Sequence, residues 1–261
     1  MYRKNDIPDA ELLARHEAAS RPVSALAADY PNATSTGEHT HERAQLLYAI
    51  EGVMIIRSAA GYWVVPPTRA VWLVPGVSHE VRMCGDVKMR TVFVAPRAAP
   101  DLPSSSSVLA VGPLLRELIL AATSVPFDYV LGSRDDRVMQ LLLDELQIIS
   151  ILPLHLPMPG DPRLRRICEA LTEAPEQEFC VAEWGRAVGV TARTVQRLFR
   201  RETGLTFGQW RQQARLLFAL ERLARGDRII DVALDSGYAS QSAFAAMFRR
   251  HFGVSPSSFY Q

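Results

Sequence analysis

One stretch of this sequence, TARTVQRLFRRETG at 191–204, concentrates side chains that could contact nucleic acid. If the stretch is helical, Val195, Leu198 and Phe199 share one face. A second face then carries the polar side chains Arg193, Gln196, Arg197 and Arg200. Guanidinium forks and an amide suit guanine, adenine and phosphate oxygens in a major groove. A solvated arginine face has the same spacing, so one helix alone leaves both interpretations open.

Histidines form a second group of candidate functional residues. His39 and His41 are two residues apart, so in a strand they point to the same face. His79 follows the turn signal Pro75-Gly76 and opens another apolar run. Three imidazoles could bind a metal ion, hydrogen-bond an organic effector, or stack in the fold without a ligand.

The arginine-rich stretch belongs to an internal repeat. EWGRAVGVTARTVQRLFRRETG at 183–204 resembles VALDSGYASQSAFAAMFRRHFG at 232–253. Each copy predicts a short helix, a turn glycine, a polar N-cap and a second helix. The glycines and caps are Gly189, Thr191, Gly237 and Ser240, so the second turn is one residue longer. This order predicts two helix-turn-helix units, and the repetition argues against a merely solvated face.

The second unit carries fewer groups that could read bases. Its helix offers Gln241, Ser242 and Arg249, while its alanines offer no polar group. We therefore expect this helix to hold the DNA backbone more than it reads bases.

A single long helix is predicted between the units, over residues 208–224. Such a rod would fix the two reading helices, at about 192–203 and 241–251, relative to each other. They could then enter successive major-groove segments, roughly 34 Å apart.

Proline and glycine divide the chain at 153–162, within the run LPLHLPMPGDP. Four prolines and a glycine there predict an interdomain linker that neither continues a helix nor pairs as a strand. The predicted domains are 1–152 and 163–261.

Short β-rich runs lie between residues 45 and 96, and turn residues separate them. They predict a small barrel or jelly roll. Apolar spacing changes to helical from 108 to 151, so the predicted class is α+β with an all-α C-terminal domain. The helices within 106–152 carry surplus apolar positions, which are Leu141, Leu142, Leu146 and Ile149. These positions predict a homodimer interface, with packing inside the chain as the alternative.

Composition limits the class of protein. The 261 residues are 48% hydrophobic, which is typical of a globular chain. From residue 160 onward there are 15 arginines and no lysine against 11 acids, which favours phosphate and base contacts. The sequence has no apolar run long enough for a membrane span and no secretory signal, so we expect a cytoplasmic protein with no membrane partner. Cys84, Cys168 and Cys180 lack metal spacing and are expected to be buried thiols.

The C-terminal part, from about 163 to 260, resembles the AraC/XylS family of bacterial transcription regulators. The resemblance rests on GYASQSAFAAMFRRHFGVSPSSFY at 237–260, including its Gly253. It implies double-stranded promoter DNA and RNA polymerase as partners. By the same resemblance Arg193, Gln196 and Arg197 read bases in the first unit, and Gln241 and Ser242 do so in the second. Ala246 stands where many members carry an arginine.

The N-terminal part, HTHERAQLLYAIEG at 39–52 followed by PGVSH at 75–79, resembles the cupin-type sensor domain often joined to such regulators. In metal-binding cupins a glutamate usually stands where Gln45 is. The resemblance therefore implies either a three-histidine metal site or an organic effector pocket. The candidate pocket residues are His39, His41, Gln45, Tyr48, Trp63, Trp72 and His79, with core packing as the alternative for the aromatic residues.

These patterns together predict an effector-responsive, sequence-specific DNA-binding regulator that requires no cofactor. Two other classes compete with this interpretation, a metal-dependent cupin enzyme with a helical appendage and a DNA binder without sensing. Gln45 in place of a carboxylate argues against the enzyme, and the sequence shows no nucleophile–base constellation.

Overall fold

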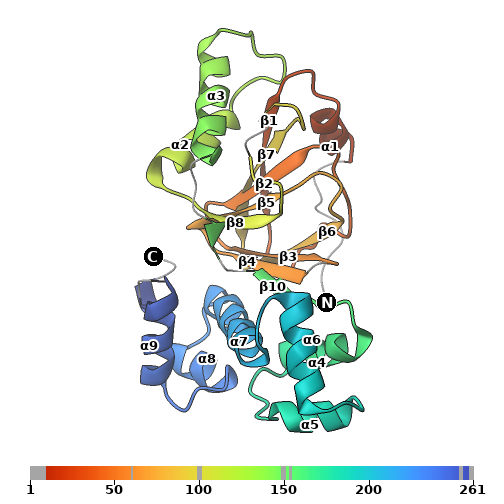
Figure 1. The fold of residues 1–261 in the computed structure, drawn as a ribbon. Helices are drawn as coiled ribbons and strands as arrows, with labels where there is room; N and C mark the ends of the chain where they lie inside the picture. Colours follow the sequence, from red (N-terminus) through yellow and green to blue (C-terminus); the bar gives the residue numbers. More distant parts are fainter. Residues whose placement is uncertain are drawn as a thin grey trace. The chain divides into compact units, whose positions relative to one another are not determined.

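The computed structural model describes residues 10–59, 61–98, 102–147, 151–152, 155–252 and 255–258. The chain forms two compact units, one made of 1–58 with 63–155 and the other of 59–62 with 156–261 (Figure 1). Among the described residues, no helix has both the length and the apolar character needed to cross a membrane.

Two β-sheets form the first unit (Figure 1). The larger sheet has the order β1-β7-β2-β5-β8-β9, and its strands are β1 (Val23–Tyr30), β7 (Val87–Val94), β2 (Ala44–Ala49), β5 (Arg69–Leu73), β8 (Ser107–Ala110) and β9 (Ile151–Leu152). The smaller sheet contains, in order, β4 (Gly61–Val65), β3 (Val53–Ser58) and β6 (His79–Cys84). The predicted class is confirmed, with antiparallel sheets in the pattern of a jelly roll. The pairing of the described strands does not close them into a continuous barrel.

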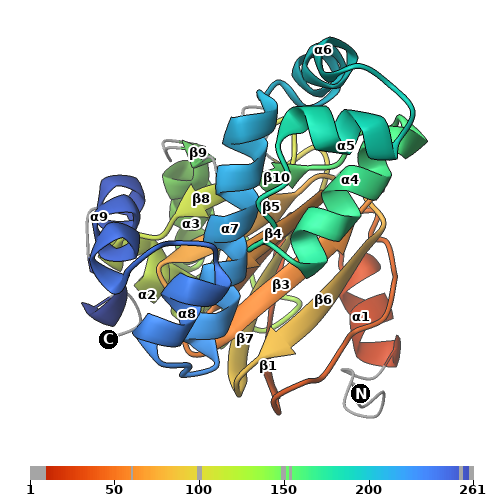
Figure 2. The same ribbon diagram turned by 90° about the horizontal axis from the view of Figure 1, so that it is seen from below.

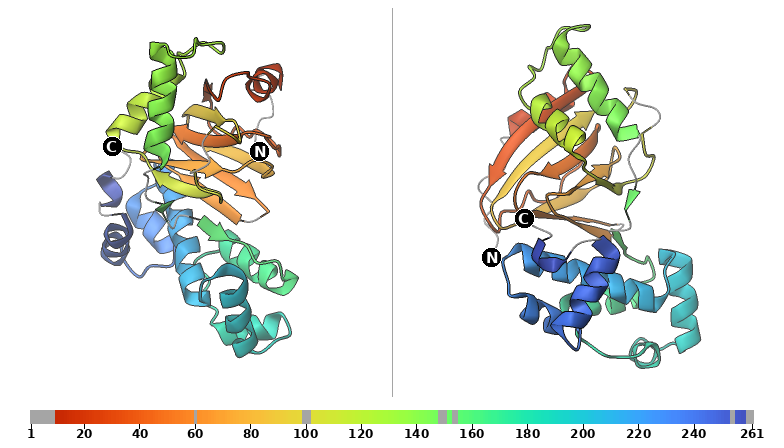
Figure 3. Two further views of the ribbon diagram at one scale, coloured as in Figure 1. Left: turned by 45° about the horizontal axis from the view of Figure 1, so that its top comes forward. Right: turned by 90° about the vertical axis from the view of Figure 1, so that its left-hand side faces the viewer.

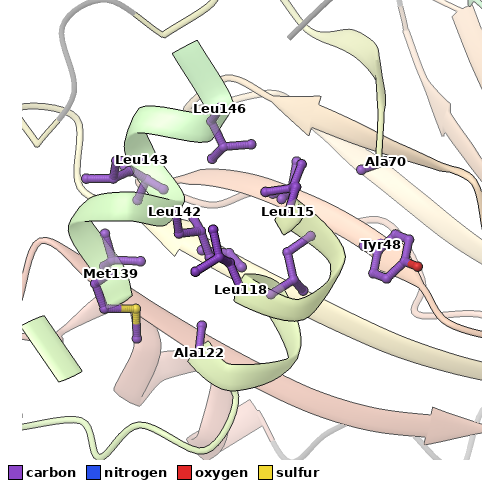
Figure 4. Close-up of a cluster of buried hydrophobic side chains, with 14 of the residues drawn as sticks. Tyr48, Ala70, Leu115, Leu118, Ala122, Met139, Leu142, Leu143 and Leu146 are labelled. Atoms are coloured by element: carbon purple, nitrogen blue, oxygen red, sulfur yellow. The ribbon is translucent and has the colours of Figure 1, made fainter. Parts of the chain in front are cut away.

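The middle of the larger sheet is buried on both faces, and every residue of its inner strand β2 is buried. Gln45 and Leu47 point to the side of the smaller sheet, where they line a cavity. Leu46 and Tyr48 point the other way and pack under the helices α2 (Pro113–Ala122) and α3 (Arg134–Gln147) (Figures 3 and 4). Because side chains alternate along a strand, consecutive residues of β2 lie either at the cavity or under the helices.

The segment predicted as helical, 108–151, begins and ends with strands. β8 pairs with β5, and β9 pairs with β8, so among the described residues between these two strands only α2 and α3 are α-helices. A run of β-branched and apolar residues beside a sheet edge follows strand pairing although its spacing also suits a helix.

The prediction of a surplus apolar face on these helices is wrong for Leu142 and Leu146. Both are at most 1% exposed and belong to the core between α3 and the sheet (Figure 4). The outer face of the sheet needs an apolar cover, and these leucines supply it. Leu141 is 43% exposed, and Ile149 lies outside the described residues.

The second compact unit, 59–62 with 156–261, is mainly helical (Figure 2). Its helices are α4 (Pro162–Glu173), α5 (Val181–Ala187), α6 (Ala192–Thr203), α7 (Phe207–Ala224), α8 (Ile229–Asp235) and α9 (Gln241–Phe252), followed by the 3₁₀ turn η1 (Pro256–Ser258). The long helix α7 coincides with the predicted rod and lies between the pair α5–α6 and the pair α8–α9 (Figure 2). Trp210, which is fully buried, anchors α7 in the core.

The proline-rich segment differs from its prediction. Residues 155–157 form a short strand, β10 (His155–Pro157), although no strand was expected there. Pro157 stands at the end of this strand, where a missing N–H group costs little. Residues 153–154 of the predicted linker lie outside the described residues. α4 then starts at Pro162 behind the N-cap Asp161.

The three cysteines are not all buried as expected. Cys84 and Cys168 are buried, but Cys180 is exposed and caps the start of α5. Its backbone N–H group donates to Glu183 at 2.7 Å, which completes a capping box.

Candidate nucleic-acid interface and sensor site

The first helix-turn-helix unit is built from α5, a tight turn and α6. The N–H group of Val190 donates to the carbonyl of Gly185 at 2.8 Å, and Gly189 has a φ of 73°. A Cβ atom at Gly185 would lie 2.7 Å from the carbonyl oxygen of Val190. Only glycine therefore lets α5 and the turn approach this closely.

The second unit repeats this geometry with α8 and α9. The N–H group of Tyr238 donates to the carbonyl of Ala233 at 2.9 Å, and Gly237 has a φ of 77°. Ala233 stands where the first unit has Gly185, so this turn leaves room for a methyl group. The sequence correspondence thus extends to the backbone, with one extra residue before the cap Ser240.

Both second helices start with an equivalent cap. The Thr191 hydroxyl accepts the N–H group of Thr194 at 3.2 Å. The Ser240 hydroxyl accepts the N–H group of Ala243 at the same distance. These caps satisfy N–H groups that have no partner within the helix.

The two faces of α6 are separated as the sequence predicts. Val195, Leu198 and Phe199 are at most 4% exposed. The exposed polar side chains are Arg193, Gln196, Arg197 and Arg200. Within the described part of the chain, none of these four side chains makes a hydrogen bond or an ion pair. Their donors are therefore available to another molecule.

The exposed face of α9 is poorer in donors. Gln241, Ser242 and Arg249 are exposed, and Phe244 and Phe248 are buried. Arg250, which the sequence analysis did not single out, is exposed as well. Gly253, named in the resemblance, lies outside the described residues.

Arg215 in α7 ties both helix-turn-helix units to the connecting helix, a role that no sequence pattern indicated. Its Nε group donates to the carbonyl of Pro175 at 2.8 Å, in the segment before α5. An Nη group of the same side chain donates to the carbonyl of Gly237 at 3.3 Å, in the second turn. A Cβ atom at Gly237 would lie 2.6 Å from this guanidinium. The turn glycine thus makes room for the arginine as well as for its own positive φ.

The three histidines of the β-sheet unit converge. His39 and His79 exchange backbone hydrogen bonds of 3.0 and 2.9 Å, which brings distant parts of the sequence together. The ring centroid of His39 lies 5.0 Å from that of His41 and 4.4 Å from that of His79. One possible ligand atom from each ring lies within 4.8 Å of the other two.

Each of these rings uses its Nδ1 atom within the protein. The partners of Nδ1 are the carbonyl of Gly37 for His39, a carboxylate oxygen of Glu17 for His41, and the carbonyl of Val77 for His79, at 2.9, 2.7 and 2.9 Å. Among the described residues, the buried Nε2 atoms of His41 and His79 have no hydrogen-bond partner. Nε2 is therefore the ring atom left for a ligand.

Burial disfavours the charged form of His79 and of His41. It lowers the pKa of His79 to about 4, although the carbonyl of Val77 opposes that change. Burial, with a smaller contribution from His39, also lowers the pKa of His41 against the opposing effect of Glu17. Neutral imidazole is the form that can coordinate a metal ion.

A cavity of about 180 Å³ lies beside this cluster. Its lining is largely apolar and includes residues of β1, β2, β6 and β7. His39 and Gln45 are among the polar residues that line it, together with Thr36 and Thr91.

The aromatic residues expected in the pocket do not line this cavity. Tyr48 and Trp72 belong to the core under α2 and α3, on the opposite face of the sheet. Trp63 is buried and stacks on His155, with 4.7 Å between ring centroids. Strand alternation accounts for Tyr48, since it is an odd number of residues from Gln45.

A β-sheet unit with an internal cavity, joined to a helical unit with two helix-turn-helix motifs, defines a DNA-binding regulator with a ligand-binding domain. The chain matches the family model described as AraC-like ligand binding domain over residues 22–188. It matches the model described as Helix-turn-helix domain over residues 184–261. The chain belongs to the AraC family of transcription regulators, and the predicted resemblance is confirmed.

Individual relatives agree with this assignment. The chain is 33% identical over 221 residues to the HTH-type transcriptional regulator NimR of Escherichia coli, covering 85% of this chain and 81% of NimR. It is 34% identical over 97 residues to the regulatory protein SoxS of Salmonella typhimurium, covering 37% of this chain and 91% of SoxS. A crystal structure of ToxT from Vibrio cholerae bound to unsaturated fatty acid covers 91% of this chain and 94% of ToxT, at 11% identity and a TM-score of 0.39. At that score the likeness supports no conclusion.

Proposed function

We propose that the two helix-turn-helix units divide the recognition of DNA, with α6 reading bases and α9 mainly holding the backbone. The observation that carries this proposal is the row of exposed, unpaired donors on α6, which are Arg193, Gln196, Arg197 and Arg200. Arginine binds guanine O6 and N7 with two donors, and glutamine binds adenine in the same manner. On α9, Gln241 and Ser242 take the base-facing positions and Arg249 a phosphate.

The test starts from the full-length protein and the DNA flanking its own gene, where a footprint gives the site. Binding should weaken steeply as salt rises, because phosphate contacts release counterions. Arg197→Ala should relax the preference for particular base pairs. Arg201→Ala is the matched control, because Arg201 already pairs with Glu202 at 2.7 Å. Binding that ignores salt, or equal loss of discrimination in the control, would contradict the proposal.

The sensor unit takes a small effector in the cavity beside the histidines. The cavity is largely apolar, and His39 and Gln45 supply polar contacts at its lining. A compact apolar molecule with one polar group fits this composition. The double change His39→Ala with His41→Ala should leave the in vitro affinity for DNA nearly intact and alter signal-dependent reporter output. A normal signal response in this double mutant would exclude the site as the sensor.

A homodimer contact through α2 and α3 is part of the same proposal. Leu114 is 51% exposed and Leu141 is 43% exposed, on the two helices that cover the sheet. Exposed leucines on neighbouring helices are typical of a contact between copies. Light scattering at micromolar concentration should give a dimer for the full-length protein and a monomer for the Leu114→Glu, Leu141→Glu variant. A monomeric native protein would contradict this part.

We also propose that the chain acts as a regulator and not as an enzyme. It would work in the cytoplasm, where it binds promoter DNA and contacts RNA polymerase. The support is the naming of its relatives as transcriptional regulators and the uncharged Gln45 beside the histidines. Transcription in vitro with purified RNA polymerase and the footprinted promoter tests it. A rate that does not depend on the protein would argue against a regulatory role.

A further inference from the structure

The histidine cluster has the chemistry of a metal site that lacks a carboxylate ligand. Its three rings converge, and in each of them the protein already engages the Nδ1 atom. A buried nitrogen with no partner is costly, and the Nε2 atoms of His41 and His79 are both in that state among the described residues. A cation bound to these two nitrogens, with the Nε2 atom of His39 as a third ligand, removes this cost for both buried rings at once.

A carboxylate is present, but it acts from behind the ring. Oε1 of Glu17, the last residue of α1 (Ala10–Glu17), accepts from Nδ1 of His41 at 2.7 Å. Its Oε2 accepts from the N–H group of Glu42 at 3.0 Å, so both oxygens are engaged. A carboxylate on Nδ1 fixes the tautomer of a ligating histidine and raises the basicity of Nε2.

Helix α1 is also held at this point by a buried arginine. The guanidinium of Arg43 donates to the carbonyls of Glu17, Ala19 and Arg21 at the end of the helix. Three consecutive residues, 41–43, therefore hold Glu17 or its helix end. The contacts of Glu42 and Arg43 hold Glu17 independently of the histidine rings.

We infer that His39, His41 and His79 bind one divalent transition-metal ion through Nε2, with Glu17 as the positioning residue of His41. Three imidazoles suit Zn²⁺, Co²⁺ and Ni²⁺ better than Mg²⁺ or Ca²⁺, which prefer oxygen ligands. His39 also lines the cavity, so the ion would present an open position to an effector there. This inference deepens the sensor function proposed above, but the binding itself is measurable without DNA.

The experiment uses full-length protein without a histidine tag, treated with chelator and titrated with Zn²⁺, Co²⁺ or Ni²⁺ in separate series. Calorimetry should give one ion per chain, and Co²⁺ should add visible absorption bands of a nitrogen-ligated site. His79→Gln should weaken binding at least 100-fold. His39→Asn, at a position less buried than His79, gives the same test if His79→Gln does not fold.

Glu17→Gln should weaken metal binding about 10-fold, which is the usual effect of removing an outer carboxylate. Glu38→Gln is the matched control, because Glu38 accepts from Ser78 at 2.7 Å and not from a histidine ring. Its metal affinity should equal that of the native protein. The inference is overturned if the native protein binds none of the three ions, or if the histidine variants bind them as tightly as it does. If the protein binds no metal but still binds DNA in a salt-sensitive manner, only the metal-site inference is rejected. If it does not bind DNA, the proposed function is rejected.

Discussion

The two helix-turn-helix units share one backbone but not one surface. Their turns make the same hydrogen bond, from Val190 to Gly185 and from Tyr238 to Ala233, and their second helices have equivalent caps. The exposed faces differ, since α6 carries four long donors and α9 carries fewer. The features that make the motif fold are thus retained in both copies, while the exposed side chains have diverged. This difference is the basis of the unequal roles that we propose for the two motifs.

The largest expected effect separates the two turns. Gly185→Ala forces a Cβ atom to 2.7 Å from a backbone oxygen, and we expect it to destabilise the helical C-terminal part of the chain by about 1–3 kcal/mol and to displace α6. Ala233→Gly, the reciprocal change, should cost only about 1 kcal/mol through backbone entropy. Chemical denaturation and DNA affinity measure both. Equal costs would show that the turns are packed alike.

The next test concerns the side chains that we expect to contact DNA. Arg197→Ala should cost about 1–3 kcal/mol on the cognate site and less on a scrambled site, because a base contact is lost. Arg249→Ala should weaken both sites similarly, because a phosphate contact carries no sequence information. Fluorescence anisotropy on the two DNAs compares them. Equal loss of discrimination from both changes would contradict unequal roles.

A smaller effect is expected where the units are joined. Arg215→Lys keeps the charge but removes the fork that reaches Pro175 and Gly237, and it should cost about 1.5 kcal/mol of stability. The affinity for the whole site should fall more than the affinity for DNA that contains only the half contacted by α6. A uniform loss on both DNAs would mean that Arg215 stabilises the unit without aligning its two motifs.

The smallest effects concern the caps, where the units should behave alike. Thr191→Ala and Ser240→Ala should each cost about 1 kcal/mol, because each removes one side-chain acceptor for a helix N–H group. Thermal unfolding of the two variants should give similar shifts. A large inequality would show that the two backbones are less equivalent than their hydrogen bonds indicate.

Local signals made the helical repeat predictable. Turn glycines, polar caps and apolar spacing act within a few residues, so Gly189, Thr191 and the faces of α6 could be identified from the sequence. His39 and His41 do converge, but not as neighbours in a strand, because His39 forms only an isolated bridge with His79 and β2 begins at Ala44. Their meeting with His79 agrees with the motif order, although no local rule gives the distance between the rings.

Other parts depend on tertiary contacts that leave no local pattern. β1 reads VSALAADY, and its alanines have weak strand propensity, so pairing with β7 decides its structure. Glu17 reaches His41 across 24 residues, and Arg215 reaches Gly237 across 22. Tyr48 has the composition of a pocket residue, but the side of the strand on which it falls places it under α2 and α3.

The connecting helix α7 sets a phase as well as a separation. It has 18 residues, which corresponds to a rod of about 27 Å, and Arg215 ties it to both motifs. A rod of fixed length also fixes the angle at which each motif meets the DNA circumference. Adding about five base pairs between the two contacted segments would turn one of them to the far side of the duplex. Adding a full helical repeat would return both segments to the same side, but the distance between them would then exceed the reach of the rod. The promoters that this protein recognises should therefore tolerate changes of base within the weaker segment far better than any change in the number of base pairs between the two segments.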